Sequence, residues 1–274
     1  MTPFRPPPGR GWPRTALGVH TAAVYLFLYL PIAVLVAFSF NSARQTALWE
    51  GFTWRWYGDL LRDERLLDAL RNSLLVAAGA TLLATVLGTL AALAMALAST
   101  SRSATSGVAA STQTLLMLPV ILPEVVLGAA LLTFFGLLHW RLSLLTVLVA
   151  HVVFSVSYVA VVVRARLAGI DPALGEAARD LGAGGWDVFR RVTLPLALPG
   201  VAAGALLVFT LSIDDYVITS FVAGVGATTL PLHIYSLLKA GVSPEVNAIS
   251  TLLLAATVIL ITLAHRLLRK GSTG

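Results

Sequence analysis

The chain has 274 residues, of which 57% are hydrophobic, 12% are charged and none is cysteine, and its formal net charge is +6. Soluble domains carry about 25% charged residues, so this composition cannot cover a soluble globule of this size with polar side chains. It therefore argues strongly against a soluble enzyme. It also excludes a disulfide scaffold, a zinc–cysteine site and an intrinsically disordered chain.

Long runs without Asp, Glu, Lys or Arg alternate with short charged segments along the chain. A helix needs about 20 mostly apolar residues to cross a bilayer, so these runs predict an all-α membrane protein. The segment 223–246 is too rich in Gly, Pro and polar residues to form a span, and the first run is too long for a cleaved signal peptide. We expect six transmembrane helices, at about 18–40, 73–98, 113–135, 143–163, 200–222 and 247–267.

The basic residues predict the orientation of these spans, because cytoplasmic loops are enriched in Lys and Arg. With the N-terminus in the cytoplasm, most basic residues fall on the cytoplasmic side: Arg5, Arg10, Arg14, Arg102, Arg164, Arg166, Arg179, Arg190, Arg191, Arg266, Arg269 and Lys270. We therefore expect cytoplasmic tails at 1–17 and 269–274, a transmembrane domain over 18–268, and a cytoplasmic loop at 164–198. The positive charge reports orientation and gives no support to nucleic-acid binding.

The loop between the fourth and fifth spans has clear helix signals. Asp171 is a good N-cap, Pro172 suits the first helical position, and Gly182 can end the helix in a left-handed conformation. Four apolar side chains recur at helical spacing: Leu174, Ala177, Ala178 and Leu181. A second short helix is predicted near Trp186.

Two prolines follow this loop. We expect Pro195 and Pro199 to break the chain before the fifth span begins, because proline removes a backbone donor. The loop is then a compact helix–turn–helix with one apolar face. From periodicity alone, a loop helix that lies on the membrane or packs on the helical bundle explains this face as well as a functional docking role does.

The same loop closely resembles the EAA loop of bacterial ABC-importer permeases. The residues that carry the resemblance are Glu176-Ala177-Ala178, Leu181-Gly182-Ala183, Leu194-Pro195-Leu196 and Pro199-Gly200. In that family the loop forms a coupling helix, which docks into a groove on the ATPase subunit. The resemblance implies that the coupling residues here are Glu176, Ala177, Ala178, Leu181, Gly182 and Ala183.

The wider chain is similar to the permease subunits of spermidine/putrescine importers, the PotC type. The similar stretches include Phe38-Ser-Phe-Asn-Ser42, Leu211-Ser-Ile-Asp-Asp215, Leu230-Pro-Leu-His-Ile-Tyr235 and Val242-Ser-Pro-Glu-Val-Asn247. The resemblance implies a MetI-like ABC-permease fold in the inner membrane and a polyamine as substrate. It also implies three kinds of partner: a pair of ATPase subunits, a second and different permease chain (PotB-like), and a substrate-binding protein.

Three acidic residues lie inside predicted spans. A carboxylate at mid-span costs about 2.5–3.5 kcal/mol on insertion scales, so it indicates a cavity, a partner or a substrate path. Glu124 follows Pro119 and Pro123; it either lines the path, is protonated, or pairs with Arg102 or Arg141. The substrate-path candidates are Glu124, Asp214, Asp215 and Tyr216.

Asp214 and Asp215 are adjacent, and neighbouring helical residues point about 100° apart. At most one of them therefore faces the path squarely, and the other caps a helix break or binds a neighbouring helix. A cationic polyamine suits both carboxylates and the ring of Tyr216.

Other signals are weak or absent. Neither Lys239 nor Lys270 lies in a phosphate-binding P-loop, so ATP is expected on a partner subunit, with no cofactor, metal or catalytic residue in this chain. The five histidines lack metal-ligand spacing and are interpreted as packing residues. Asn72 and Ser73 are interpreted as a helix cap. Small-residue spacings, such as Gly200-x-x-x-Gly204 and Ala84-x-x-x-Gly88, favour close helix packing in lipid.

Three alternatives stay open at this point. The same permease architecture could carry another solute, such as an opine, an aminophosphonate or another organic amine. An ion-driven secondary transporter could use Glu124 and the Asp214–Asp215 pair, although such a carrier has no ATPase for an EAA loop to bind. A membrane-embedded enzyme is disfavoured because no catalytic cluster is evident.

Overall fold

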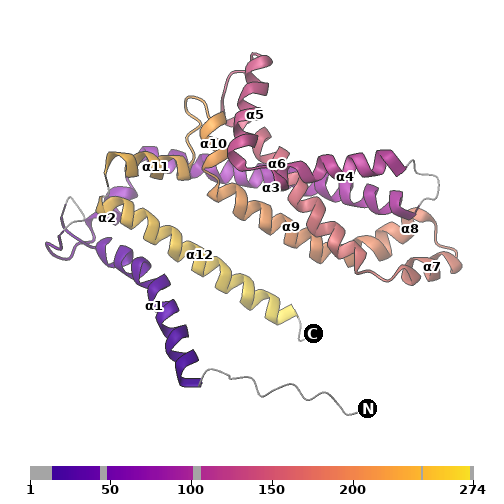
Figure 1. Ribbon diagram of the computed structural model, residues 1–274, viewed down its shortest axis with the longest axis horizontal. Helices are drawn as coiled ribbons and strands as arrows, with labels where there is room; N and C mark the ends of the chain where they lie inside the picture. The colour runs from indigo at the N-terminus through magenta and orange to yellow at the C-terminus, as the bar shows by residue number, and fades with distance from the viewer. Residues whose placement is uncertain (1–13, 44–47, 101–105, 242, 272–274) are drawn as a thin grey trace, which may run out of the picture. The chain divides into compact units, whose positions relative to one another are not determined.

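A computed structural model describes residues 14–43, 48–100, 106–241 and 243–271 (Figure 1). Over these residues the regular structure is helical, apart from an isolated antiparallel bridge between Asn41 and Phe52, which confirms the predicted all-α class. Parts of the predicted tails (1–13 and 272–274) and Arg102 lie outside the described residues. The elements are α1 (Arg14–Phe38), α2 (Arg55–Leu60), α3 (Glu64–Thr100), α4 (Ser106–Ile121), α5 (Glu124–Leu137), α6 (Leu144–Ala168), α7 (Pro172–Asp180), α8 (Gly185–Val188), the π-helical turn η1 (Phe189–Thr193), α9 (Leu194–Asp214), α10 (Val217–Val222), α11 (Leu230–Ala240) and α12 (Pro244–Gly271).

The chain divides into two compact units. The first comprises Met1–Asp63 and Leu237–Gly274, and the second comprises Glu64–Ser236. In the first unit, α1 and α2 both contact α12. The second unit contains α3 to α10 and the first turns of α11, and it carries the predicted coupling and pathway residues.

The core of the second unit is formed by α3, α6 and α9, which pack on one another. Val159 of α6 is fully buried between the other two helices. A Cβ atom at Gly88 of α3 would lie 2.6 Å from the Val159 Cβ, and one at Gly204 of α9 would lie 3.4 Å from its Cγ1. Gly88 and Gly204 therefore both lie at helix-packing positions beside Val159, as the small-residue spacings predict. At Gly88 the approach requires a missing side chain, whereas at Gly204 an added Cβ would make an ordinary contact.

Within the part of the chain that the structure describes, four helices are long and apolar enough to cross a membrane: Thr15–Phe38, Glu64–Ala98, Leu144–Ala168 and Gly185–Asp214. They correspond to the first, second, fourth and fifth predicted spans. The counterpart of the second predicted span, α3, begins at Glu64, nine residues before the predicted start at 73. The sixth predicted span, 247–267, lies within α12, and its crossing of the membrane stays a prediction.

The third predicted span is not one straight helix. Gln113–Ile121 and Glu124–Leu137 are bent by 112° at the break between them. Pro123 stands at the N-cap of α5 with extended backbone (ψ 137°), and it has no N–H with which to continue α4. The segment 113–135 is therefore a bent pair of helices, its crossing of the membrane as one span stays a prediction, and Glu124 lies in the first turn of a new helix.

The fifth predicted span is also different, because its prolines do not break it. The helix is continuous from Gly185 to Asp214. Pro195 lies in its first α-helical turn after η1, where the Leu194 N–H donates to the carbonyl of Phe189 five residues earlier. In this wider π turn the backbone hydrogen bonds reach back five residues, so the four-residue α-helical bonds that a proline disrupts are absent there.

The break occurs later, at the acidic pair. Asp215 is extended (ψ 121°), so α9 ends at Asp214 and α10 begins at Val217. The predicted span over 200–222 is therefore two helices, with the break at the acidic pair that the sequence left open. The physical reason is that the Asp215 carboxylate accepts hydrogen bonds from the backbone N–H groups of Ile218 and Thr219, which an unbroken helix would need for itself.

In the first unit, the loop between α1 and α2 is organised by a buried amide. The Asn41 Nδ2 donates to the carbonyl of Leu48 (2.7 Å), and its Oδ1 accepts from the Glu50 N–H (3.0 Å). Beside it, the rings of Phe40, Trp54 and Tyr57 pack together.

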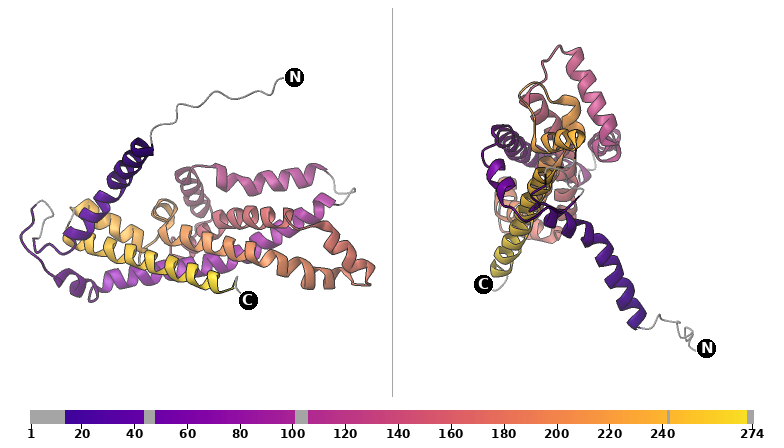
Figure 2. Two further views of the ribbon diagram at one scale, coloured as in Figure 1. Left: turned by 90° about the horizontal axis from the view of Figure 1, so that it is seen from below. Right: turned by 90° about the vertical axis from the view of Figure 1, so that its left-hand side faces the viewer.

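Within the second unit, the two ends of the α3–α6–α9 core carry different structures. The α7–α8 hairpin (residues 171–188) lies at one end, and α5 and α10 lie side by side toward the other (Figures 1 and 2). These two regions contain the candidate functional residues.

The close approach at Gly88 gives a stability prediction. Gly88→Ala should destabilise the protein by about 1–3 kcal/mol, because the new methyl group meets both Val159 and the backbone oxygen of Val156. Gly136→Ala is the matched control, since Gly136 lies in α5 with nothing within 4 Å of an added Cβ. The midpoint of thermal unfolding in detergent should fall for Gly88→Ala and not for Gly136→Ala. Equal midpoints would contradict the packing at Val159.

Candidate functional site

The first candidate region is the α7–α8 hairpin, whose start is fixed by local chemistry. The Asp171 Oδ1 accepts a hydrogen bond from the Ala173 N–H (2.9 Å), and Pro172 occupies the first turn of α7. The carboxylate satisfies a backbone donor that the helix leaves free. Both features agree with the sequence prediction.

The end of α7 is a Schellman motif around Gly182. Gly182 has φ +87°; its N–H donates to the carbonyl of Arg179 (2.8 Å), and the Ala183 N–H donates to that of Ala178 (3.0 Å). Residues other than glycine rarely adopt this left-handed conformation, so the predicted turn at Gly182 is confirmed. The turn reverses the chain and brings α8 back beside α7.

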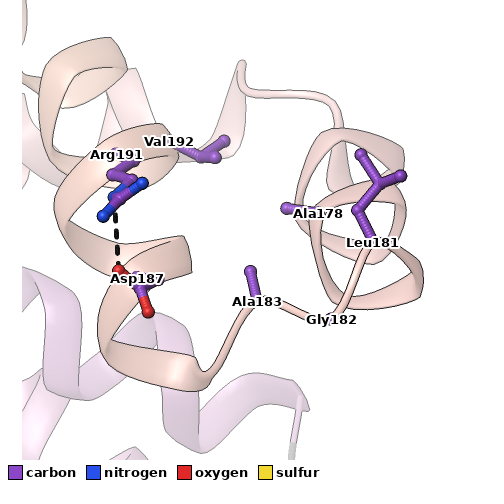
Figure 3. Close-up of a pocket in the computed structure, with 7 residues that line it drawn as sticks. All are labelled: Ala178, Leu181, Gly182, Ala183, Asp187, Arg191 and Val192. Atoms are coloured by element: carbon purple, nitrogen blue, oxygen red, sulfur yellow. Dashed lines mark ion pairs between the residues drawn. The ribbon is translucent and has the colours of Figure 1, made fainter.

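A shallow hollow of about 350 Å³ opens between the two arms of the hairpin. Ala178, Ala183 and Val192 point into it in Figure 3. An ion pair between Asp187 and Arg191 (3.2 Å) lies on one wall, and both side chains are largely exposed. Four of the predicted coupling residues line the hollow, namely Ala178, Leu181, Gly182 and Ala183, whereas Glu176 and Ala177 are exposed on α7.

The hairpin presents large apolar side chains to its surroundings. Leu181 is 89% exposed, Trp186 is 69% exposed and Leu174 is 48% exposed. The ring of Trp186 packs on that of Phe189 at 5.4 Å between centroids, which fixes one face of the indole. A cluster of exposed apolar side chains around a hollow is typical of a protein-docking surface.

One arginine attaches this hairpin to the core. The Arg166 Nε, near the end of α6, donates to the carbonyl of Leu196 in α9 (2.9 Å). Gly200 makes room for the aliphatic part of the arginine, since a Cβ at that position would lie 2.5 Å from the Arg166 Cβ. The two helices that enter and leave the hairpin are therefore held together at its base.

The second candidate region contains the predicted pathway acids. Glu124 is exposed in the first turn of α5, next to the 112° bend. A carboxylate near the N-terminus of a helix is stabilised by the helix dipole. The bend therefore offers one reason why an acidic residue is tolerated there.

Asp214 and Asp215 occupy different environments. The Asp214 residue is exposed, whereas the Asp215 side chain is only 5% exposed. The Asp215 Oδ2 accepts hydrogen bonds from the N–H (2.8 Å) and the Oγ1 (2.7 Å) of Thr219. The structure thus assigns Asp215 to capping the helix break, which the sequence left open between the two residues.

Sequence reasoning missed the partner of Asp215 on another helix. The His151 Nε2 lies 3.2 Å from the Asp215 Oδ2, and its Nδ1 lies 2.7 Å from the Ser212 Oγ. The prediction that His151 is a packing residue is therefore incomplete, because the ring also bridges two elements. A histidine in an otherwise apolar span was the available signal, but nothing in the sequence names its partner.

Asn72 and Ser73 do not cap the start of their own helix, contrary to the sequence interpretation. They lie inside α3, because this helix begins at Glu64. The Asn72 Nδ2 donates to the carbonyls of Gly226 (3.1 Å) and Thr228 (3.0 Å), and the Ser73 Oγ accepts from the Leu230 N–H (2.8 Å). These side chains hold the loop that leads into α11.

The loop held by α3 places an aromatic pair beside the acids. The rings of Tyr216 and Tyr235 lie 4.3 Å apart between centroids, with an interplanar angle of 40°. Tyr216 directly follows Asp215, so the break in the α9–α10 segment brings an aromatic face next to the carboxylates. Among the described residues, no group of three or more His, Asp or Glu side chains could hold a metal ion.

Residues 84–271 match the family model described as the inner-membrane component of binding-protein-dependent transport systems. The chain belongs to this family. It is therefore a permease subunit of an ABC importer, as the EAA-like loop predicts, and an inner-membrane location agrees with this membership. The relatives by sequence are permease subunits as well, which agrees with a transport role rather than an enzymatic one.

Polyamine permeases and one aminophosphonate permease are similar to this chain over nearly their whole length. The chain is 40% identical to the spermidine/putrescine transport system permease protein PotC of Escherichia coli K12, over 95% of this chain and 98% of that protein. It is 42% identical to the putrescine transport system permease protein PotI of the same strain, over 90% and 88%. A putative 2-aminoethylphosphonate permease, PhnV of Salmonella typhimurium LT2, is 30% identical over 94% and 96%.

The fold is shared with solved ABC importers at low sequence identity. A bacterial transporter involved in alginate import matches with a TM-score of 0.72 at 19% identity, over 93% of both chains. The methionine transporter MetNI in an inward-facing conformation matches with a TM-score of 0.64 at 21% identity, over 74% of this chain and 94% of that one. These likenesses confirm the predicted MetI-like permease fold.

The Schellman turn gives a local prediction with a control in the same loop. Gly182→Ala should loosen the end of α7, because an L-residue in the left-handed region costs about 1–2 kcal/mol. Gly184→Ala should not, since Gly184 has φ −69° and, like Gly182, has open space around an added Cβ. Hydrogen exchange of the backbone amides over 172–183 should become faster only in Gly182→Ala. Equal exchange in the two variants would contradict this role of Gly182.

Proposed function

We propose that this chain forms one half of the translocation path of an ABC importer for a small cationic amine, most specifically a polyamine such as putrescine or spermidine. The observation that carries the substrate class is the identity of about two residues in five with polyamine permeases, over nearly the full length of both chains. The aminophosphonate permease is less similar, at 30%. The polyamine is therefore the favoured substrate.

The exposed acids support a cationic substrate. Asp214 ends α9 and Glu124 begins α5, each at a break in an otherwise apolar segment, and both residues are exposed. A carboxylate in such a segment is tolerated where it faces water, a partner or a substrate. In this proposal Glu124 and Asp214 face the path and attract the ammonium groups of the polyamine.

Tyr216 is proposed to line the same path. Its ring is paired with that of Tyr235, and aromatic faces attract ammonium groups beyond their apolar contact. Asp215 has a different role in this proposal, because its side chain is buried and bonded within the protein. It supports the path and does not meet the substrate.

The α7–α8 hairpin is proposed to bind the ATPase subunit. Its exposed Leu181 and Trp186 offer apolar anchors around the hollow, and the adjacent Glu176 offers a charge at the edge. Binding of ATP brings two ATPase subunits together, and the docked hairpins then shift the membrane subunits between two states. In this proposal ATP is bound only by the partner, and this chain holds no cofactor.

The remaining partners and the orientation complete the proposal. A second permease chain, different from this one and PotB-like, forms the other half of the path, and a substrate-binding protein delivers the polyamine from outside. Both termini and the 164–198 loop face the cytoplasm, in accord with the positive-inside distribution of Arg and Lys. The hairpin is then on the same side as the ATPase.

The function is tested by uptake with the whole transporter. The chain is co-produced with its partner permease, ATPase and substrate-binding protein and reconstituted in vesicles. ATP-dependent uptake of labelled putrescine is expected, and Glu124→Gln and Asp214→Asn should each lower the uptake rate by about tenfold or more, because each removes a charge that contacts the cation.

Two outcomes would contradict this assignment. Uptake of 2-aminoethylphosphonate without uptake of putrescine or spermidine would replace the substrate class. Unchanged putrescine uptake in both Glu124→Gln and Asp214→Asn would remove these acids from the path. Asp59→Asn serves as a control, since Asp59 is an exposed acid that pairs with Arg55 outside the apolar helices.

Docking of the ATPase is tested by reversing one charge. Glu176→Lys should leave the permease in the membrane at normal abundance but abolish uptake. The reason is that the proposed ATPase groove would meet a positive charge at this position in place of a negative one. Co-purification of the ATPase in mild detergent should fall in parallel. Asp68→Lys, at an exposed acid of α3, is the control. Normal uptake and normal ATPase recovery with Glu176→Lys would refute the docking assignment.

A further inference from the structure

A buried imidazole bridges the break between α9 and α10. His151 belongs to α6, and its side chain is 1% exposed. Its Nδ1 lies 2.7 Å from the Ser212 Oγ in the last turn of α9, and its Nε2 lies 2.9 Å from the Thr219 Oγ1 in α10. One ring from a third helix therefore contacts both sides of the break.

We infer that His151 is a positioning residue for the substrate path. It keeps the α9–α10 break in one geometry and thereby directs the Asp214 carboxylate outward, away from the protein interior. This inference rests on the proposed function, in which Asp214 meets the cationic substrate. His151 does not contact the substrate in this inference, but it sets the position of the Asp214 carboxylate that does.

The hydrogen bonds leave little freedom at the break. The Thr219 hydroxyl donates to the Asp215 Oδ2 (2.7 Å), so the contact between this hydroxyl and the His151 Nε2 needs a proton on the histidine nitrogen. The same nitrogen lies 3.2 Å from the Asp215 carboxylate. His151, Thr219 and Asp215 thus form a closed set of contacts that uses Asp215 internally.

The short helix after the break depends on α6 at both of its ends. α10 spans only Val217–Val222, which is too short to be stable by its own backbone bonds. At its far end the carbonyl of Val222 lies 2.8 Å from the Thr146 Oγ1 of α6. His151 at the near end and Thr146 at the far end therefore both hold α10 against α6.

Loss of the imidazole would leave a buried carboxylate with fewer partners. Such a group is costly, and a local rearrangement that exposes Asp215 to water lowers that cost. Because Asp214 and Asp215 are adjacent, a rotation that exposes Asp215 turns Asp214 away from its present direction. The predicted defect is therefore in the path and not in the ATPase cycle.

The test uses the complete reconstituted transporter with the binding protein saturated with putrescine. Putrescine uptake and ATP hydrolysis are measured together, and their ratio is the readout, since a merely structural defect lowers both in proportion. His151→Phe should lower the putrescine transported per ATP about fivefold, a size usual for groups in one network. His151→Gln, whose amide can still donate and accept, should restore most of the ratio.

A double variant tests whether His151 acts through Asp214. If it does, His151→Phe added to Asp214→Asn should lower the ratio by less than about twofold further, because the group being positioned is already lost. Effects that multiply would overturn the inference. Thr219→Val, which removes one hydroxyl of the network, should lower the ratio in the same direction, so the question stays decidable if His151→Phe does not assemble.

Controls separate this inference from the proposed function. His233→Phe replaces another buried histidine of the same unit, whose Nε2 has no hydrogen-bond partner among the described residues, and it should leave the ratio unchanged. An unchanged ratio in both His151→Phe and Thr219→Val would overturn the positioning role. Absence of putrescine uptake by the unmodified transporter would instead refute the proposed function.

Discussion

The structure of the second unit depends on how closely three apolar helices can approach in lipid. The surrounding acyl chains are as apolar as the side chains, so the helices gain little from burial and must gain from tight contact. Val159 of α6 supplies that contact, with Gly88 on one side and Gly204 on the other. An added methyl group at Gly88 would already be too large, which makes this layer specific as well as tight.

Three irregular features of this unit are tied to the same helix. Along α6, Thr146 holds the end of α10, His151 holds the α9–α10 break, and Arg166 holds the base of the α7–α8 hairpin. The polar contacts are placed where neighbouring backbone is irregular. This is expected in lipid, because irregular backbone there must find its partners inside the protein.

The continuous helix from Gly185 to Asp214 connects the two candidate regions. It begins in the hairpin that we propose as the ATPase contact and ends at the acid that we propose for the path. The π turn at Phe189–Thr193 lets this helix pass Pro195 without a break. A displacement of the hairpin can therefore reach Asp214 along one helix, without passing through loops.

The sequence by itself determined the class of protein, four of the spans and the local chemistry of the hairpin. Composition and run length suffice for the class and the spans, and the Asp171 cap, Pro172 and the turn at Gly182 are set by contacts within a few residues. Only the tertiary structure decided what depends on distant residues. It placed the breaks at Glu124 and Asp215, carried the helix through Pro195, assigned Asn72 and Ser73 to a distant loop, and paired His151 with Asp215. A proline or an aspartate in an apolar run can stand inside a helix at some cost, as Pro199 does, or at a helix end, as Pro123 and Asp215 do. The run itself does not say which, because the packing of neighbouring helices contributes to the choice.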